Sequence, residues 1–159
     1  MMTRVEANDP GAMFMLAARY YHGLNGMLQD HAKAIELFTK SADLGCSEAH
    51  NQLGAIYHDG GALKKAKFHV ETAAMAGHEG ARHNLGVMEA ESGNMERAIK
   101  HWTIAASAGD YKAMHVLRTQ FEQGLLRRES IDSTLTAYNN SCAEMRSEAR
   151  DAAIHDILE

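Results

Sequence analysis

The sequence predicts an all-α fold in which helix pairs stack into a solenoid. The first observation is that alanine, leucine and glycine recur with a period of 32 residues, which is typical of such solenoids. The recurring columns are Ala34, Ala66 and Ala98; Ala42, Ala74 and Ala106; Gly45, Gly77 and Gly109; Ala49, Ala81 and Ala113; and Leu53, Leu85 and Leu117. The second observation is a composition with many alanines, ten methionines and one proline. Small residues favour close helix–helix packing over a β-sandwich.

The first repeat is predicted over residues 9–45, after a lead-in at residues 1–8. Asp9 can cap its first helix, because aspartate side chains accept hydrogen bonds from free backbone N–H groups. Gly23 should end that helix. Asp30 can cap the second helix, which should end at the glycine of the repeat because glycine adopts the left-handed conformation at little cost.

The second and third repeats, residues 46–77 and 78–109, follow the same plan. Their helices are expected near residues 47–58, 63–76, 79–92 and 95–108. A bulky residue recurs in the second helix of each repeat, at Phe38, Val70 and Trp102. Large groups beside columns of alanine allow two helices to interdigitate.

The C-terminal part departs from the pattern. Residues 110–129 are predicted to form a partial fourth repeat, and residues 130–159 a cap of two helices. Ser130 can begin the first of these helices, and a last short helix is expected after Ser147. Such an atypical end is usual in solenoids, whose terminal units face water.

Charge and cysteine content exclude several classes of protein. The net charge of −5 provides no basic surface for nucleic acid. No apolar run approaches the length of a membrane span. Two distant cysteines, Cys46 and Cys142, indicate free thiols in a reducing compartment. Together with the lack of a secretory signal, this makes the cytoplasm the expected location.

Nothing in the sequence predicts catalysis or a cofactor. The ten histidines include no His-x-x-x-His pair, and no Cys-x-x-Cys motif is present, so no metal site is expected. No nucleophile–base constellation and no phosphate-binding glycine loop can be identified. Helical arrays present surfaces rather than deep pockets, so a small-molecule ligand is not expected either, and an enzyme is only a distant third interpretation.

The repeats resemble the Sel-1-like branch of the tetratricopeptide superfamily, whose pattern is roughly A-x-x-x-L-G-x-x-Y-x-x-G, a variable loop, and A-x-x-x-x-x-x-A-A-x-x-G. The second repeat matches most fully, at Ala49, Leu53, Gly54, Tyr57, Gly60, Ala66, Ala73, Ala74 and Gly77. The third departs at Glu89, where the pattern has tyrosine, and the first has Ala17 in place of the first-helix glycine. The similarity covers about residues 8–125.

This resemblance implies a right-handed superhelix that binds a partner protein or peptide as a non-enzymatic scaffold or adaptor. It also implies an alternative, a substrate-recruiting or regulatory segment of an enzyme complex such as a RING-type ubiquitin ligase, with activity in a separate module. The chain itself shows no Cys/His ligand set for a RING-type module.

In the superfamily, the first helices of the repeats line a concave groove. The positions expected to face it here are Phe14, Tyr21, Asn51, His58, His83, His115 and Glu122. The polar side chains could hydrogen-bond a partner's backbone while the two aromatic residues supply apolar anchors. The alternative is that the polar groups are only solvated and the aromatic residues cap the first helix pair.

Overall fold

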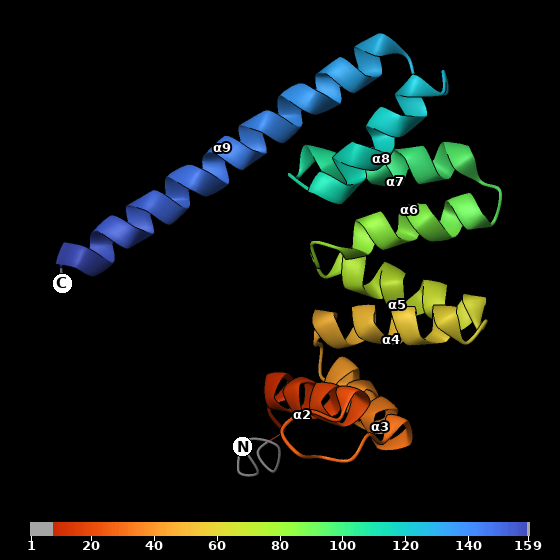
Figure 1. Cartoon of the computed structure of the whole chain (residues 1–159), viewed down its shortest axis with the longest axis vertical. Coiled ribbons are helices and arrows are strands. Elements are labelled where there is room, and N and C mark those ends of the chain that lie inside the picture. The colour runs from red at the N-terminus through yellow and green to blue at the C-terminus, as the bar shows by residue number, and fades with distance from the viewer. Residues whose placement is uncertain (1–7, 159) are drawn as a thin grey trace. The chain divides into compact units, whose positions relative to one another are not determined.

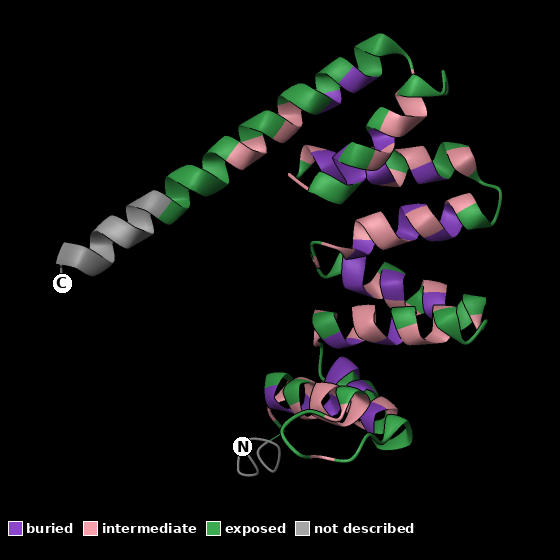
Figure 2. Ribbon diagram, viewed as in Figure 1, coloured by how far each residue is buried: buried purple, intermediate pink, exposed green. Residues whose placement is uncertain are grey.

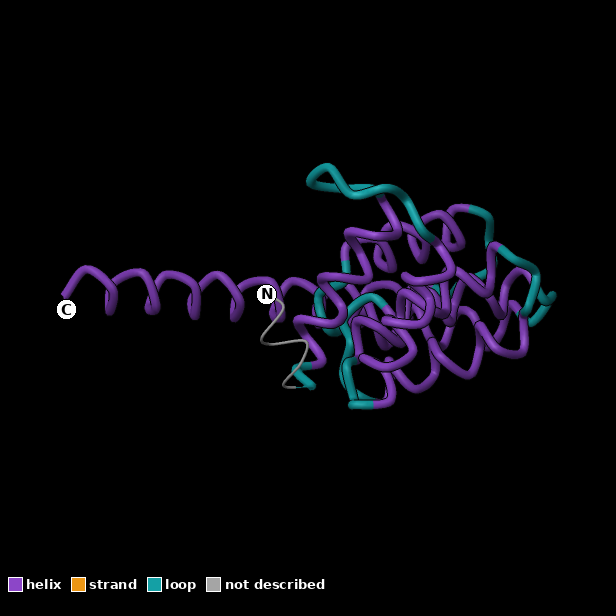
Figure 3. The backbone as a smooth tube through the Cα atoms, turned by 90° about the horizontal axis from the view of Figure 1, so that it is seen from below, coloured by secondary structure: helices purple, strands orange, loops and turns teal. Residues whose placement is uncertain are grey.

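The computed structural model describes the backbone of residues 8–158 and the side chains of residues 8–149. Its helices are α2 (Pro10–His22), α3 (His31–Asp43), α4 (Ser47–Asp59), α5 (Leu63–Met75), α6 (Ala81–Glu91), α7 (Met95–Ser107), α8 (Tyr111–Glu122) and α9 (Arg128–Leu158) (Figure 1). Only helices and loops occur in this range, without any strand (Figure 3). The predicted all-α class is therefore confirmed.

The chain divides into two compact units, residues 1–81 and 82–159. The first contains α2 to α5, and the second contains α7, α8, α9 and all of α6 except its first residue. In the first unit, α2 packs on α3, α3 on α4, and α4 on α5. In the second, α9 packs on both α7 and α8.

The helix ends follow the capping signals in the sequence. An Asp9 carboxylate oxygen accepts hydrogen bonds from the backbone N–H groups of Gly11 and Ala12, at 2.9 and 3.2 Å. The Asp30 carboxylate accepts one from the Lys33 N–H at 2.9 Å. Gly23 follows α2 in the left-handed conformation, with φ of 65°. Asp9, Asp30 and Gly23 therefore act as predicted.

Loss of the Asp30 cap should weaken the first unit measurably. Asp30→Ala is expected to lower the free energy of unfolding by about 1 kcal/mol, because the Lys33 N–H loses its acceptor at the start of α3. Asp30→Asn should retain most of the stability, since asparagine caps helices equally well. Chemical denaturation of the three proteins checks this, and equal stability of the alanine variant and the wild type would contradict it.

The core of the first unit is built from small residues around one aromatic ring, and Figure 2 marks the buried positions along its helices. Its fully buried cluster consists of Ala17, Ala34, Phe38, Ala42, Ala49 and Leu53. In the next helix pair, Gly54 of α4 faces Val70 of α5 so closely that a Cβ atom on the glycine would clash with Val70 Cγ2. The predicted packing of a bulky second-helix residue, Phe38 or Val70, beside buried alanines is present.

The second unit repeats this arrangement with a larger ring. Trp102 is 4% exposed, and a Cβ atom on Gly86 would lie 2.8 Å from its Cε2 atom. Glu89, which occupies the position of the repeat tyrosine, is 2% exposed. Its carboxylate accepts a hydrogen bond from the Asn94 side chain at 3.0 Å and lies 3.4 Å from the Arg97 guanidinium. These partners offset the cost of burying a charge at a position where the repeat pattern has tyrosine.

The C-terminal cap differs from the prediction in two respects. It is one continuous helix, α9, rather than two, and it begins at Arg128, so Ser130 lies inside it and is not the capping residue. Near its middle, the Ser141 hydroxyl donates a hydrogen bond to the Ser107 carbonyl at 2.7 Å. Met145 lies against Gly109 at the end of α7. No helix within the described residues has the length and apolar character that a membrane span requires.

Candidate functional site

The second unit contains an open groove where α8 meets α9. It has a volume of about 380 Å³ and is lined by Tyr111, Met114, His115, Arg118, Phe121, Ile131, Asp132, Leu135 and Tyr138. Six of these nine side chains are aromatic or aliphatic, whereas Arg118, Asp132 and His115 supply polar groups. Two apolar members are well exposed, Tyr111 at 70% and Leu135 at 43%. The groove thus combines accessible apolar side chains with a few polar ones.

Two of the residues expected to face a partner lie on α8, at or beside this groove. His115 is exposed, and its ring stacks on that of Tyr111 with centroids 6.3 Å apart. Glu122 is exposed, and its carboxylate lies 3.8 Å from the Arg118 guanidinium one turn earlier. Such exposed ion pairs contribute little to folding, so the Glu122 carboxylate and the Arg118 guanidinium are available for contacts with another molecule.

The two aromatic anchors expected in the first unit are largely used for internal packing. The Phe14 ring lies 5.6 Å from that of Phe38, and the Tyr21 ring lies 6.4 Å from the same ring. Tyr21 also stacks on His31 at 4.8 Å. Both are half-buried against the core cluster, which corresponds to the alternative in which they cap the first helix pair.

The remaining expected residues, Asn51, His58 and His83, are half-buried. His58 lies on α4 with its Nδ1 atom 3.7 Å from the Asp59 carboxylate. His83 lies on α6, and its Nδ1 atom has no hydrogen-bond partner among the described residues. Because these positions are divided between the two units, a single continuous binding face remains a prediction.

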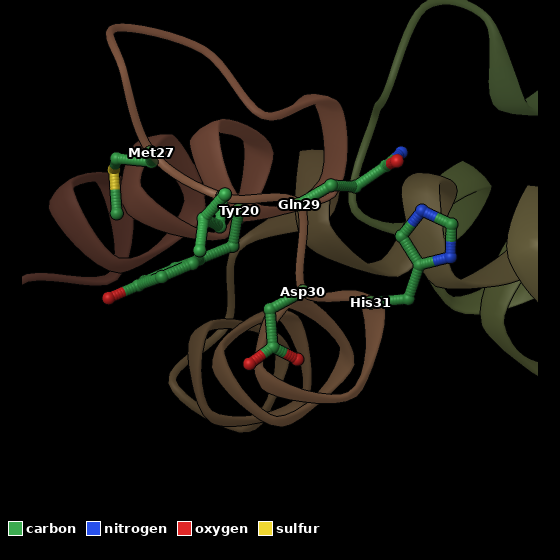
Figure 4. Close-up of a pocket in the computed structure, with 6 residues that line it drawn as sticks. Tyr20, Met27, Gln29, Asp30 and His31 are labelled. Atoms are coloured by element: carbon green, nitrogen blue, oxygen red, sulfur yellow. The ribbon is translucent and has the colours of Figure 1, made fainter.

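A pocket beneath the long loop of the first repeat does not form a converging site. It is lined by Tyr20, Met27, Leu28, Gln29, Asp30 and His31. Figure 4 shows Tyr20 and Met27 on one side, Gln29 and His31 pointing to the other, and Asp30 directed away from both pairs. Asp30 is already committed to the cap of α3. The arrangement gives no common point for a ligand.

The structure also brings together a histidine pair that sequence reasoning missed. His50 of α4 and His69 of α5 are half-buried, and their Nδ1 atoms lie 2.9 Å apart. The His69 ring also stacks on Tyr57, with centroids 5.5 Å apart. The two histidines are separated by 19 residues, a spacing that matches no metal motif and no single helix face. No sequence signal could have identified them.

Burial of two histidines, His69 and His83, predicts that the stability of the chain depends on pH. It lowers the pKa of His69 because the charged imidazolium is poorly solvated there, and the charge of His50 lowers it further against an opposing effect of Asp43. Burial likewise lowers the pKa of His83, which Asp110 opposes and Lys112 reinforces. In both cases, the folded chain holds the proton less tightly than the unfolded chain, whose histidine pKa is about 6.5.

The free energy of unfolding should therefore be highest above about pH 6.5 and fall as the pH drops below it. When the pH is lowered from 7.5 to 5.5, the free energy of unfolding measured in urea should fall less for His69→Gln than for the wild type. The fall for His69→Gln should also be smaller than that for His115→Gln, which replaces an exposed histidine and provides the matched control. An equal fall in the free energy of unfolding for His69→Gln and the wild type would contradict the lowered pKa of His69.

Comparison with protein families matches the Sel1 repeat model to residues 10–46, 47–78 and 80–110. The chain belongs to the Sel1 repeat family. These ranges lie within a few residues of the first three predicted repeats, so the resemblance seen in the sequence is confirmed. The predicted partial repeat at residues 110–129 lies outside the matched ranges, apart from residue 110.

Known proteins with similar sequences or structures agree with this assignment. The ERAD-associated E3 ubiquitin-protein ligase component HRD3A of Arabidopsis thaliana is 35% identical over 57 residues, which are 36% of this chain and 8% of that protein. A protective antigen of uropathogenic Escherichia coli with an SLR fold is 27% identical, with a TM-score of 0.71 over 88% of this chain and 32% of its own. A Sel1 repeat protein from Oxalobacter formigenes is 28% identical, with a TM-score of 0.63 over 74% of this chain and 94% of its own.

Proposed function

We propose that this chain is a non-enzymatic scaffold or adaptor that binds a segment of a partner protein on the first helices of its repeats. The groove between α8 and α9 is the observation that supports this most directly. It lies on the one first helix that carries exposed members of the expected partner-facing set, His115 and Glu122. Membership of a helical-repeat family adds support, because such arrays bind partners over extended surfaces.

The composition of the groove fits a peptide better than a small molecule. Tyrosine and arginine are enriched among the residues that dominate protein–protein binding energy, and here Tyr111, Tyr138 and Arg118 line one groove. An apolar peptide side chain would cover the exposed faces of Tyr111 and Leu135. Arg118 and Asp132 would then fix the direction of the bound segment through its backbone or charged side chains.

The proposal is tested with a partner isolated by affinity purification of the full chain and then made as a pure protein. An Asn51/His83/His115 triple alanine variant, and separately Tyr111→Ala, should each weaken its binding at least about tenfold, equivalent to about 1.4 kcal/mol. Phe68→Ala is the matched control, because Phe68 is 61% exposed on α5, outside the groove. Equal affinity of all these variants for the partner would exclude the expected surface.

The match to HRD3A favours a second candidate, a component that recruits substrates to a ubiquitin-ligase assembly. The chain spans only 8% of that protein, so its activity and partners carry over only as a proposal. Ubiquitination components among the directly bound partners would support this candidate. Substrate turnover by the isolated chain would instead contradict the non-enzymatic role. The free thiols of Cys46 and Cys142 support the proposal of a reducing, cytoplasmic setting.

A further inference from the structure

The histidine pair between α4 and α5 has the arrangement of a ligand set. The Nδ1 atoms of His50 and His69 face each other at 2.9 Å, and the ring planes are inclined by 38°. Neutral imidazoles at this distance share one hydrogen bond, in which one Nδ1 donates and the other accepts. A metal ion can take the place of the shared proton once that proton moves to the Nε2 atom of the same ring.

The surroundings hold the His69 ring in place. Its face stacks on Tyr57 at an interplanar angle of 18°, and the neighbouring Phe68 ring makes an edge-on contact with it, with centroids 5.2 Å apart. The Lys65 ammonium group covers the Tyr57 ring at 5.5 Å. A ligand held by packing loses less conformational freedom when it binds a metal.

We propose that His50 and His69 form a binding site for a divalent transition-metal ion with square or octahedral geometry, of the Cu²⁺ or Ni²⁺ type. With metal–nitrogen bonds of about 2.0–2.1 Å, nitrogens 2.9 Å apart subtend an angle of about 90° at the metal. This is the angle between adjacent ligands in tetragonal Cu²⁺ and Ni²⁺ sites. Tetrahedral Zn²⁺ requires nitrogens about 3.3 Å apart.

Two protein ligands leave the other coordination positions to water. Among the described residues, no group of three or more His, Cys, Asp or Glu side chains is arranged to hold a metal ion. The site should therefore bind more weakly than a four-ligand structural site and exchange its metal readily. Because α4 and α5 each supply one ligand, the bound ion would also link the two helices of the second repeat and stabilise the first unit.

The test uses the full chain without an affinity tag, titrated with NiCl₂ and with ZnCl₂ at pH 7.5 by calorimetry. His50→Gln and His69→Gln should each weaken Ni²⁺ binding at least about tenfold, since each removes one of two ligands. His58→Gln removes another half-buried histidine of α4 and should leave the affinity unchanged. Ni²⁺ affinity unaffected by His50→Gln, or lowered equally by His58→Gln, would overturn the site.

A second measurement on the wild type does not depend on the folding of any variant. Substoichiometric Cu²⁺, which is paramagnetic, should broaden the backbone NMR signals around His50 and His69 before those of α8 and α9. Broadening first around His115, or uniformly over the ten histidines of the chain, would identify only adventitious binding. Tighter binding of Zn²⁺ than of Ni²⁺ would contradict the geometric part of the proposal.

Discussion

Phe38→Ala is expected to lower the free energy of unfolding of the first unit by about 3–5 kcal/mol, a large part of the roughly 5–15 kcal/mol that is typical of a folded domain. Phe38 is 1% exposed, and it is the largest side chain in a cluster otherwise formed by four alanines and one leucine. Alanines cannot move inward to refill the space, so the cavity would persist. Phe14 and Tyr21 would also lose their ring contacts.

The control for this prediction is Phe68→Ala, which removes the same side chain from an exposed position of α5. Phe68 is 61% exposed and loses only its edge-on contact with the His69 ring, so its removal should cost about 1 kcal/mol at most. The free energy of unfolding of both variants is measured by circular dichroism during urea denaturation. Similar losses for the two phenylalanines would mean that the core is not organised around Phe38.

The repeat period made most of the helical architecture predictable, for a physical reason. Each helix pair must bury its apolar side against neighbours, so the same small and bulky residues return at the same places. Helix ends were predictable where the residue itself sets the backbone, as at Gly23, or supplies a hydrogen-bond acceptor, as at Asp9 and Asp30. The single long α9 was not predicted. From Leu125 onward the sequence contains no glycine or proline, so nothing interrupts the helix at Ser147.

The candidate site was less predictable, because exposure depends on what a side chain meets in space. Phe14 and Tyr21 occupy the expected first-helix positions, yet the small residues around Phe38 leave room that both rings partly fill. The groove beside His115 forms only because α9 packs against α8, which the repeat pattern does not specify. His50 and His69 meet through packing between two helices and belong to no repeated column.

Gly54→Ala should destabilise the first unit by about 2–3 kcal/mol, although alanine ordinarily favours a helix over glycine. The added methyl group would clash with Val70 Cγ2 and lie 3.4 Å from the Ala66 carbonyl oxygen and the Val70 nitrogen. Val70 is 2% exposed and Ala66 is fully buried, so neither has space into which it can withdraw. The α4–α5 pair must therefore separate or distort.

Two further variants distinguish this clash from an effect on helix propensity. In Gly54→Ala/Val70→Ala the offending methyl group is gone, so the double variant should lose at least about 1 kcal/mol less than the sum of the two single losses. At the neighbouring exposed position, Ala55→Gly should cost about 0.5–1 kcal/mol, the opposite preference on the same helix. Additive losses in the double variant would show that glycine is needed at position 54 for some reason other than the close approach of α4 to α5.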